Sequence, residues 1–486
     1  MYQESLDKLT PARIMQFIRH HHDYQRPRLQ MLDDYYQGFN TNILKPDNRR
    51  TDTEKADHRA VHSFGKYIAD FQTSFSVGNA INVKHDDDDK KLDEIEDAND
   101  FDSLNSELFL DTTRYGRAYE YIYRGNDDIE HSVLFDPLET FVIYSLEVDP
   151  QPVMAVRYHL IEVVGDNNKS VLQYRIETWT ADKYTLYQPT YLDSSMTIEQ
   201  QEPIFAFPVV EYTNNRFRIG DFENVIPLID LYDAAQSDTA NYMTDLNDAM
   251  LVVKGDIDTL LQGSNLMGGI DPTDEDAAKK LAQDKMDMLK EMKNANMLLL
   301  KSGVDISGKQ TTVDANYIHK EYDVNGTESY KSRLAHDIHK FSHTPDLTDE
   351  NFAGNSSGVA MKYKVLGTIE LASTKRKQFE KGLFKRYSII YKLENKASGG
   401  MTTDPRTLEF TFRDNMPTDD LATINQITQA GAQLPQEYLY QFLPNISDPS
   451  KITEQLAKQQ SEQVKQARAD YGAATDKELS GDGQTE

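Results

Sequence analysis

The sequence contains no cysteine among its 486 residues. Disulfide bonds and thiolate zinc sites are therefore excluded. The chain also lacks any run of about 18 apolar residues, the length that a membrane-spanning helix requires. The first thirty residues have neither a long apolar core nor a small-residue cleavage site, so we expect no signal peptide. These absences are compatible with folding in the cytosol.

Positive charge is scarce as well. Lysine and arginine number 52 against 80 aspartate and glutamate residues, which gives a formal net charge of −28. Such a chain is not expected to coat anionic membranes or to hold nucleic acid by bulk attraction. The pattern G-x-x-x-x-G-K-[ST] is absent, so no P-loop supports ATP hydrolysis. The adjacent residues His20, His21 and His22 lack a carboxylate–histidine spacing, so we expect them to be exposed, and we expect neither a metal nor a cofactor.

One motif points to an enzyme. The stretch FAGNSSG at 352–358 contains G-x-S-x-G, the nucleophile elbow of serine hydrolases, with Ser356 as the nucleophile. The elbow needs an apolar strand before the serine, but HTPDLTDENF precedes it, and the chain has no histidine after His343. We therefore expect no enzyme and interpret the segment as a loop and helix N-cap. Its backbone N–H groups would also suit transient contact with phosphate.

Hydrophobic spacing predicts the order of the elements in the first half of the chain. Helical patterns cover residues 1–37, 64–78 and 92–113. Residues 117–212 contain short runs rich in Tyr, Val, Ile and Thr, which predict strands. A mixed sheet that follows helices indicates an α+β domain, and we expect Trp179 in its core.

A long helix is predicted next, followed by an insertion. Residues 227–252 have helical spacing, with Pro227 suited to the first turn and Gly255 at the end. Residues 256–324 predict a small α/β insertion with a methionine-rich acidic helix and two short strands. The methionines either form a partner surface or pack inside the insertion.

Two further helices follow the insertion. Residues 327–343 predict the first, with Asn325 and Glu328 as a capping box. Residues 359–396 predict a longer one, which carries ten Lys or Arg and three Glu. This excess of seven positive charges either neutralises acidic neighbours, in the same chain or in an adjacent subunit, or faces nucleic acid. We favour neutralisation.

Four segments carry a family resemblance. They are YYQGFN at 35–40, HSFGKYIADFQTSFSVGNAINV at 62–83, EYTNNRFRIGDFENVIPLIDLYDAAQSD at 211–238 and, most specific, FSHTPDLTDENFAGNSSGVAMKYKVLGTIELASTKRKQFEKGLF at 341–384. Their order and spacing resemble the portal proteins of tailed bacteriophages, in the branch typical of long-tailed phages of Gram-positive hosts. The resemblance covers most of residues 30–465.

The resemblance implies a portal-type α+β subunit with several domains and long helices, which assembles with about eleven others into a ring around a central channel. The implied parts are an N-terminal segment and wing (1–225), a first stem helix (226–255), a clip insertion (256–325), a second stem helix (326–344), a tunnel loop (345–358), a long wing helix and strand (359–418), a helical crown (419–472) and a disordered acidic tail (473–486).

The resemblance also implies where the functional surfaces lie. The tunnel loop that faces DNA would comprise Asn351, Phe352, Ala353, Gly354, Asn355, Ser356, Ser357 and Gly358. The stem helices would present Asp245, Asp248, Lys331 and Lys340 to the channel. The clip surface for partners would include Asp271, Asp274, Glu275, Asp276, Met286 and Met288.

The implied function is a conduit at one capsid vertex of the virion. Double-stranded DNA would pass through it without sequence specificity during packaging, retention and ejection. The implied partners are the terminase large subunit, head-completion or connector proteins, and the major capsid and scaffolding proteins, with no membrane. The alternative is another ring-forming structural protein of the virion that does not contact DNA.

Overall fold

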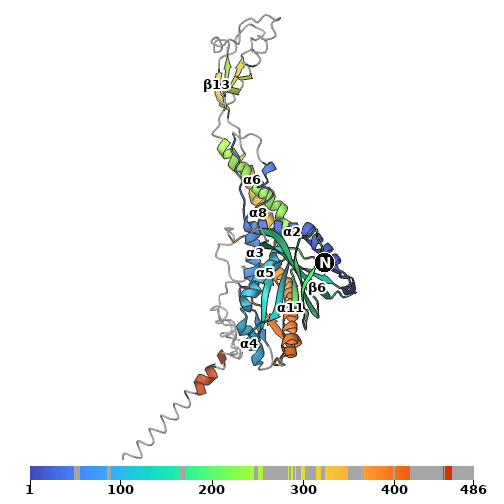
Figure 1. Ribbon diagram of the computed structural model, residues 1–486. Helices are drawn as coiled ribbons and strands as arrows, with labels where there is room; N and C mark the ends of the chain where they lie inside the picture. Colours follow the sequence, from blue (N-terminus) through green and yellow to red (C-terminus); the bar gives the residue numbers. More distant parts are fainter. Residues whose placement is uncertain are drawn as a thin grey trace, which may run out of the picture. The chain divides into compact units, whose positions relative to one another are not determined.

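The computed structural model describes most of the chain, namely residues 1–48, 55–84, 89–164, 170–245, 250–255, 297–301, 314–318, 323–347, 363, 365–397 and 400–415 (Figure 1). It also describes short helical pieces at 283, 286–287, 290–291, 452–453, 455–461 and 463. The chain folds into two units. Unit 1 contains Met1–Gln37, Ser63–Val225 and the described residues from His339 onward, and unit 2 contains Gly38–His62 and Ile226–Ile338.

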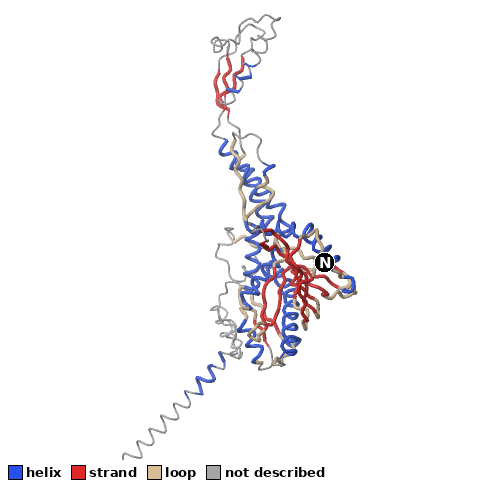
Figure 2. The backbone as a smooth tube through the Cα atoms, viewed as in Figure 1, coloured by secondary structure: helices blue, strands red, loops and turns tan. Residues whose placement is uncertain are grey.

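Unit 1 is built on two sheets (Figure 2). The larger sheet has the strand order β1-β5-β6-β7-β8-β9 and is antiparallel except where β1 pairs with β5. Its strands are β1 (Tyr2–Gln3), β5 (Thr140–Tyr144), β6 (Pro152–Val164), β7 (Ser170–Trp179), β8 (Lys183–Thr190) and β9 (Ile198–Pro203). The smaller, antiparallel sheet has the order β10-β3-β4, from β3 (Arg117–Arg124), β4 (Glu130–Phe135) and β10 (Val209–Thr213).

The central strand β3 shows why the two sheets pack together. Its side chains alternate between opposite faces, as in any strand. Tyr119 packs with Trp179 in a cluster shared with the larger sheet. Ala118 and Ile122 belong to a different cluster, which lies under helices. The strands expected over residues 117–212 are present but divide between two sheets instead of forming one, and the core position of Trp179 is confirmed.

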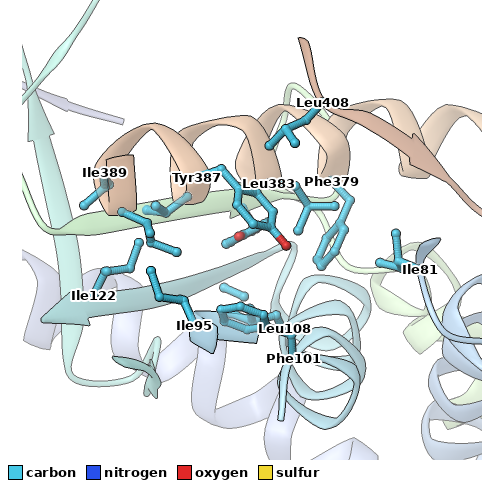
Figure 3. Close-up of a cluster of buried hydrophobic side chains, with 14 of the residues drawn as sticks. Ile81, Ile95, Phe101, Leu108, Ile122, Phe379, Leu383, Tyr387, Ile389 and Leu408 are labelled. Carbon is cyan, nitrogen blue, oxygen red and sulfur yellow. The ribbon is translucent and has the colours of Figure 1, made fainter. Parts of the chain in front are cut away.

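The second cluster is formed by helices α5 (Phe101–Tyr115) and α11 (Leu366–Ala397), which both pack on the smaller sheet. Figure 3 shows Phe379, Leu383 and Tyr387 of α11 pointing toward Phe101 and Leu108 of α5. The face of α11 approaches β10 closely, since a Cβ atom at Gly382 would lie 2.2 Å from the Tyr212 ring. The predicted long helix is therefore present, and burial of its apolar face accounts for its position.

Several basic residues of α11 form ion pairs within unit 1. Arg386 pairs with Glu120 at 2.6 Å, Lys375 pairs with Asp221, and Arg376 pairs with Asp414 at 2.5 Å. The first two pairs are almost completely buried. Neutralisation of acidic neighbours in the same chain therefore accounts for these three of the ten positive charges.

The N-terminal helices lie on the larger sheet. Thr10 caps α1 (Pro11–His20) by accepting a hydrogen bond from the Arg13 N–H, and α1 continues through a π-helical turn, η2 (His21–Gln25), into α2 (Arg26–Gln37). The wider turn brings His21 inward. Its ring is fully buried, stacks on Phe141 and lies 2.7 Å from the Tyr158 hydroxyl. The expectation that all three histidines are exposed is therefore wrong for His21.

The remaining elements of unit 1 are short, apart from one helix. They are α3 (Phe64–Val77), α4 (Lys90–Ala98), the two-stranded sheet of β2 (Asn82–Lys84) and β14 (Glu409–Thr411), and the 3-10 turns η1 (Leu6–Lys8), η4 (Glu223–Val225) and η6 (Pro405–Thr407). Helix α3 packs against α2, α5 and α11. The helix expected at 64–78 and the strand expected within 359–418 are confirmed, and the helical pattern at 92–113 is divided between α4 and α5.

Unit 2 contains helix α6 (Ile226–Asp245), most of helix α8 (Val324–Phe341) and a three-stranded sheet, together with the short turn η3 (Pro46–Asn48). The sheet has the order β12-β11-β13, from β11 (Met250–Gly255), β12 (Met297–Lys301) and β13 (Asp314–Ile318). The two short strands expected in the insertion are therefore present.

Two expectations for unit 2 were wrong. The helix expected over 227–252 ends before residue 250, because residues 250–255 pair with β12 and β13 as strand β11 instead. The cap of α8 is also different. Asp323, not Asn325, accepts the Gly326 N–H at 2.9 Å, because the helix begins one residue earlier than Asn325. Among the described helices, none is both long and apolar enough to cross a membrane.

Candidate functional site

The residues of the expected tunnel loop that would face DNA, 351–358, lie outside the described residues, but the first three residues of the loop, 345–347, and the chain on both sides of it are described. The chain enters through residues 342–347, after α8, and leaves into α11. Within unit 1 these two flanks meet at one backbone carbonyl, that of His343. We call the five residues that form this junction the loop anchor: Tyr67, Gln72, His343, Thr344 and Thr368.

The carbonyl oxygen of His343 accepts two hydrogen bonds. One comes from Nε2 of Gln72 on α3, at 3.2 Å, and the other comes from Oγ1 of Thr368 on α11, at 2.6 Å. A carbonyl oxygen has two lone pairs, so both bonds can form together. Because Thr368 follows the expected loop and His343 precedes it, the second bond joins the chain on the two sides of the loop.

Helix α3 provides a second and a third contact. Gln72 also donates from Nε2 to Oγ1 of Thr344, at 3.1 Å, and the Tyr67 hydroxyl donates to the Pro345 carbonyl at 2.9 Å. Gln72 and Thr344 are almost completely buried. Burial raises the pKa of Tyr67, so its hydroxyl stays protonated and remains a donor at neutral pH.

The backbone before the loop turns sharply. His343 has a φ of 53°, in the left-handed region that residues other than glycine seldom adopt. The turn is closed by reciprocal contacts, since the Thr344 N–H donates to the His339 carbonyl at 3.1 Å and Nδ1 of His339 lies 3.1 Å from the Thr344 carbonyl. The His339 ring also packs edge-on against Tyr67. Side chains on three helices thus fix the point at which the loop begins.

The loop anchor was missed from the sequence, although one signal was available. Gln72 is four residues after Ile68 and three before Phe75, and both of these neighbours are buried. A polar residue on the apolar stripe of a helix needs a hydrogen-bond partner, because burying an amide without one is costly. Its partners, at 343 and 344, are about 270 residues away and could not be identified by local spacing.

In unit 2, a polar ladder runs along α6. Three polar side chains on consecutive turns of α6 accept hydrogen bonds from a segment of the chain that is neither helix nor strand. They are Asp233, Ser237 and Asn241, and they bond every second backbone N–H of that segment. The donors are His62 at 3.0 Å, Ala60 at 2.9 Å and His58 at 2.6 Å. We call residues 58–62 the strap.

The spacing of the ladder follows from backbone geometry. Four residues of an α-helix rise about 6 Å, and two residues of an extended chain span about 6.6 Å. Every fourth helix residue therefore meets every second strap residue. Asp233 is fully buried and also accepts from Nδ2 of Asn40 at 2.7 Å and bonds Nδ1 of His62 at 2.8 Å. Burial raises the pKa of Asp233, and the hydrogen bonds from Asn40 and His62 oppose that rise.

The residues expected to face the channel have different environments. Asp245 is the last residue of α6, and Lys340 is exposed on α8, beside the Phe341 ring. Lys331 is 5% exposed, and its amine donates to Oε1 of Gln236 on α6, at 3.1 Å, while pairing with Glu328. Its amine therefore links α6 to α8 within the chain. Asp248 lies outside the described residues.

Of the expected clip surface, only Met286 is described, and it is exposed within a helical piece. Asp271, Asp274, Glu275, Asp276 and Met288 lie outside the described residues, as do the eight residues of the expected tunnel loop. The expected crown and tail at 419–486 are described only within 452–463. In the described part of the chain, no group of three or more His, Asp or Glu residues could hold a metal ion.

Comparison with known proteins identifies the family. Residues 15–466 match the family described as "Phage portal protein, SPP1 Gp6-like". The chain is 23% identical over 478 residues to the portal protein of Clostridium phage phiCD119, an alignment that covers 93% of this chain and 97% of that protein. It is 20% identical over 279 residues to the portal protein of Bacillus phage SPP1, covering 52% and 51% of the two chains. Because the family match extends over most of the sequence, the chain belongs to the SPP1 Gp6-like family of phage portal proteins.

Proposed function

We propose that this portal protein forms a ring of about twelve subunits at one capsid vertex, and that double-stranded DNA passes through its central channel. The family is a structural one whose members are virion components. The observation that carries the proposal for this chain is the loop anchor. It joins His343, which precedes residues 351–358, to Thr368, which follows them, on one framework of helices.

The anchor suits a loop that touches a moving duplex. A segment whose ends are joined at His343 can meet DNA repeatedly without disturbing the helices that carry it. Its Gly, Ser and Asn residues offer backbone N–H groups and small side chains, which can contact phosphates without reading bases. Sequence-independent passage requires contacts of this kind.

The charge of the chain supports the same function. Strong phosphate contacts would hold DNA through counterion release and resist its movement. A net charge of −28 keeps such contacts few. We assign Asp245, Asp248 and Lys340 to the channel-facing surface of the stem. Lys331 is bonded between α6 and α8, so we assign it to holding the two stem helices together.

The partners follow from the assigned parts. We propose that the insertion 256–325 docks the terminase large subunit during packaging and head-completion or connector proteins afterwards. The major capsid and scaffolding proteins would surround the ring at the vertex. In this scheme the portal protein is a conduit, and the terminase supplies the ATP hydrolysis.

The first experiment is the mass of the purified native particle, combined with end-on electron microscopy. Twelve chains of 55.6 kDa give a particle of about 670 kDa, which should show a central hole. A ring near that mass supports the proposal. A monomer or dimer that forms no ring even after capsid and scaffolding proteins are added would overturn it.

A second measurement separates a DNA conduit from a ring-forming virion protein that never contacts DNA. Variants Asn355→Asp and Ser356→Asp add negative charge to the expected tunnel loop. If the loop touches DNA, the amount packaged per particle should fall while ring assembly is preserved. Unchanged packaging in both variants would favour the alternative.

A further inference from the structure

Unit 1 contains a cavity of about 500 Å³ that belongs neither to the loop anchor nor to the expected stem, clip or tunnel surfaces. It lies between the N-terminal residues and strands β3, β5 and β10. Its volume falls within the range of about 300–1,000 Å³ that is typical of ligand pockets. One part of its lining is aromatic, including Tyr2, Phe17 and Phe141, and another part contains three arginines.

Two of these arginines already have carboxylate partners. Arg218 makes a bidentate pair with Glu211, at 2.8 and 2.9 Å, and Arg13 pairs with Glu4 at 2.9 Å. Glu211 also accepts the Tyr144 hydroxyl. Burial alone would raise the pKa of Glu211, but Arg218 and then Arg117 hold it below its usual value. Glu211 is thus charged and fully engaged.

Arg117 differs from the other two. It is only 8% exposed, and it forms no ion pair with any carboxylate of the described residues. Its Nη2 donates to Oε1 of Gln25 at 3.2 Å, but its Nε has no acceptor in the described part of the chain. Glu211 is near enough for Arg117 to lower its pKa, but Glu211 bonds Arg218 and Tyr144 rather than Arg117. The cavity therefore contains a mostly buried guanidinium that is not directly paired with a carboxylate, and buried guanidinium groups normally pair with an anion.

The aromatic part of the lining favours a ligand that also has an apolar body. The Tyr2 ring packs edge-on against Phe17 at 5.4 Å and Phe141 at 5.1 Å between ring centroids. Burial raises the pKa of Tyr2 to about 12, so this wall is neutral at physiological pH. A flat or aliphatic group can rest on such a wall, while a charged group at its end reaches Arg117.

We propose that this cavity is a binding site for a carboxylate on an aromatic or aliphatic body, with Arg117 as the residue that pairs with the carboxylate. Arginine suits this role because its planar fork matches a carboxylate in a bidentate fashion. The carboxylate can come from a free organic acid or from an Asp or Glu side chain of a neighbouring subunit, and the test separates these sources.

The first arm of the test compares two probes of the same shape. The full-length protein is titrated with 4-hydroxyphenylacetate and with its neutral amide, 4-hydroxyphenylacetamide, and binding is followed by calorimetry and saturation-transfer NMR. We expect the acid to bind at least about tenfold more tightly than the amide, as a charge-assisted bond requires. Arg117→Gln should abolish this preference. The matched control Arg216→Gln removes an exposed arginine outside the cavity and should keep it.

Two results would overturn the proposal. One is equal affinity for acid and amide in the unaltered protein, and the other is an unchanged preference in a folded Arg117→Gln protein. Arg117→Lys is a second variant that tests the proposal if Arg117→Gln does not fold. Lysine keeps the positive charge but lacks the planar guanidinium. It should retain a reduced preference for the acid, and a full loss in a folded Arg117→Lys protein would also count against the proposal.

The second arm identifies the source of the carboxylate and rests on the proposed ring. The acid is titrated into assembled particles and into dissociated subunits. Binding to both identifies a free organic acid as the ligand. Binding to dissociated subunits alone identifies a carboxylate of the neighbouring subunit, which already fills the site in the particle. Binding to neither form would reject the site, whether or not the ring itself is found.

Discussion

Thr368 Oγ1 lies 2.6 Å from the carbonyl oxygen of His343, so a residue that follows the expected tunnel loop is bonded directly to one that precedes it. One side chain therefore joins the chain before the expected loop to the chain after it. Gln72 adds a second donor to the same oxygen from α3. Removing either donor should weaken the closure without changing the loop itself.

Thr368→Val should lower the free energy of unfolding of unit 1 by about 1 kcal/mol, because valine keeps the shape but loses the donor. Urea unfolding followed by circular dichroism measures this change. Thr374→Val is the matched control, since Thr374 is exposed on the same helix and bonds only the Glu370 carbonyl within that helix. An equal effect of the two variants would show that the bond to His343 is not special.

The double variant Gln72→Leu with Thr368→Val should cost more than the sum of the two single changes, by about 1–2 kcal/mol, since only the pair leaves the His343 carbonyl without a donor. The same double variant should reduce packaged DNA per particle if the loop must start from a fixed point. If the free-energy costs of the two single changes simply add up, and the double variant packages a normal amount of DNA, the loop anchor does not have the proposed role.

The buried pair Arg386–Glu120 allows a sharper test of electrostatics. Arg386→Met should cost about 3–5 kcal/mol, because it leaves a fully buried carboxylate without its counter-charge. The double variant Arg386→Met with Glu120→Leu should recover most of this loss. The exposed pair Arg406–Asp404 is the control, and Arg406→Met should leave the stability almost unchanged, because solvent screens an exposed ion pair. If the double variant does not regain the stability lost in Arg386→Met, the two side chains are needed for packing.

The burial of Asp111 predicts that the stability of the protein depends on pH. Burial raises its pKa from 3.8 to about 7, so the folded chain binds a proton there that the unfolded chain has released. Between pH 4 and 7 the folded state holds more protons, so stability must fall as pH rises, by up to about 1.4 kcal/mol per unit. Asp111→Asn should flatten this slope and stabilise the protein at pH 7–8. An unaltered slope in Asp111→Asn would contradict the assignment.

Much of the fold could be predicted from the sequence, and the portal family was identified correctly from the order of its segments. Local patterns were sufficient for α3, α11 and the strands of unit 1, because each buries one face at a regular period. Residues 250–255 were misassigned because a short apolar run suits a helix or a strand equally, and pairing with β12 and β13 decides between them.

The contacts at the candidate site could not be predicted in the same way. Gln72 with His343, and Asp233 with His62, join residues more than 150 positions apart. Each bond depends on backbone placement that only the complete fold supplies. His21 was expected to be exposed because it has polar neighbours, but the π-helical turn rotates it inward onto Phe141. Such local departures from regular geometry have no clear signature in composition.

The ladder between α6 and the strap has a mechanical consequence. The chain passes from unit 2 to unit 1 at His62 and Ser63, immediately after the residue that bonds Asp233. A force applied along the strap would load the bonds made by His58, Ala60 and His62 in parallel, because all three join the strap to the same helix. A slip of one residue would break register at all three together. Under such a force we expect the strap to resist extension up to a limit and then to release in a single step.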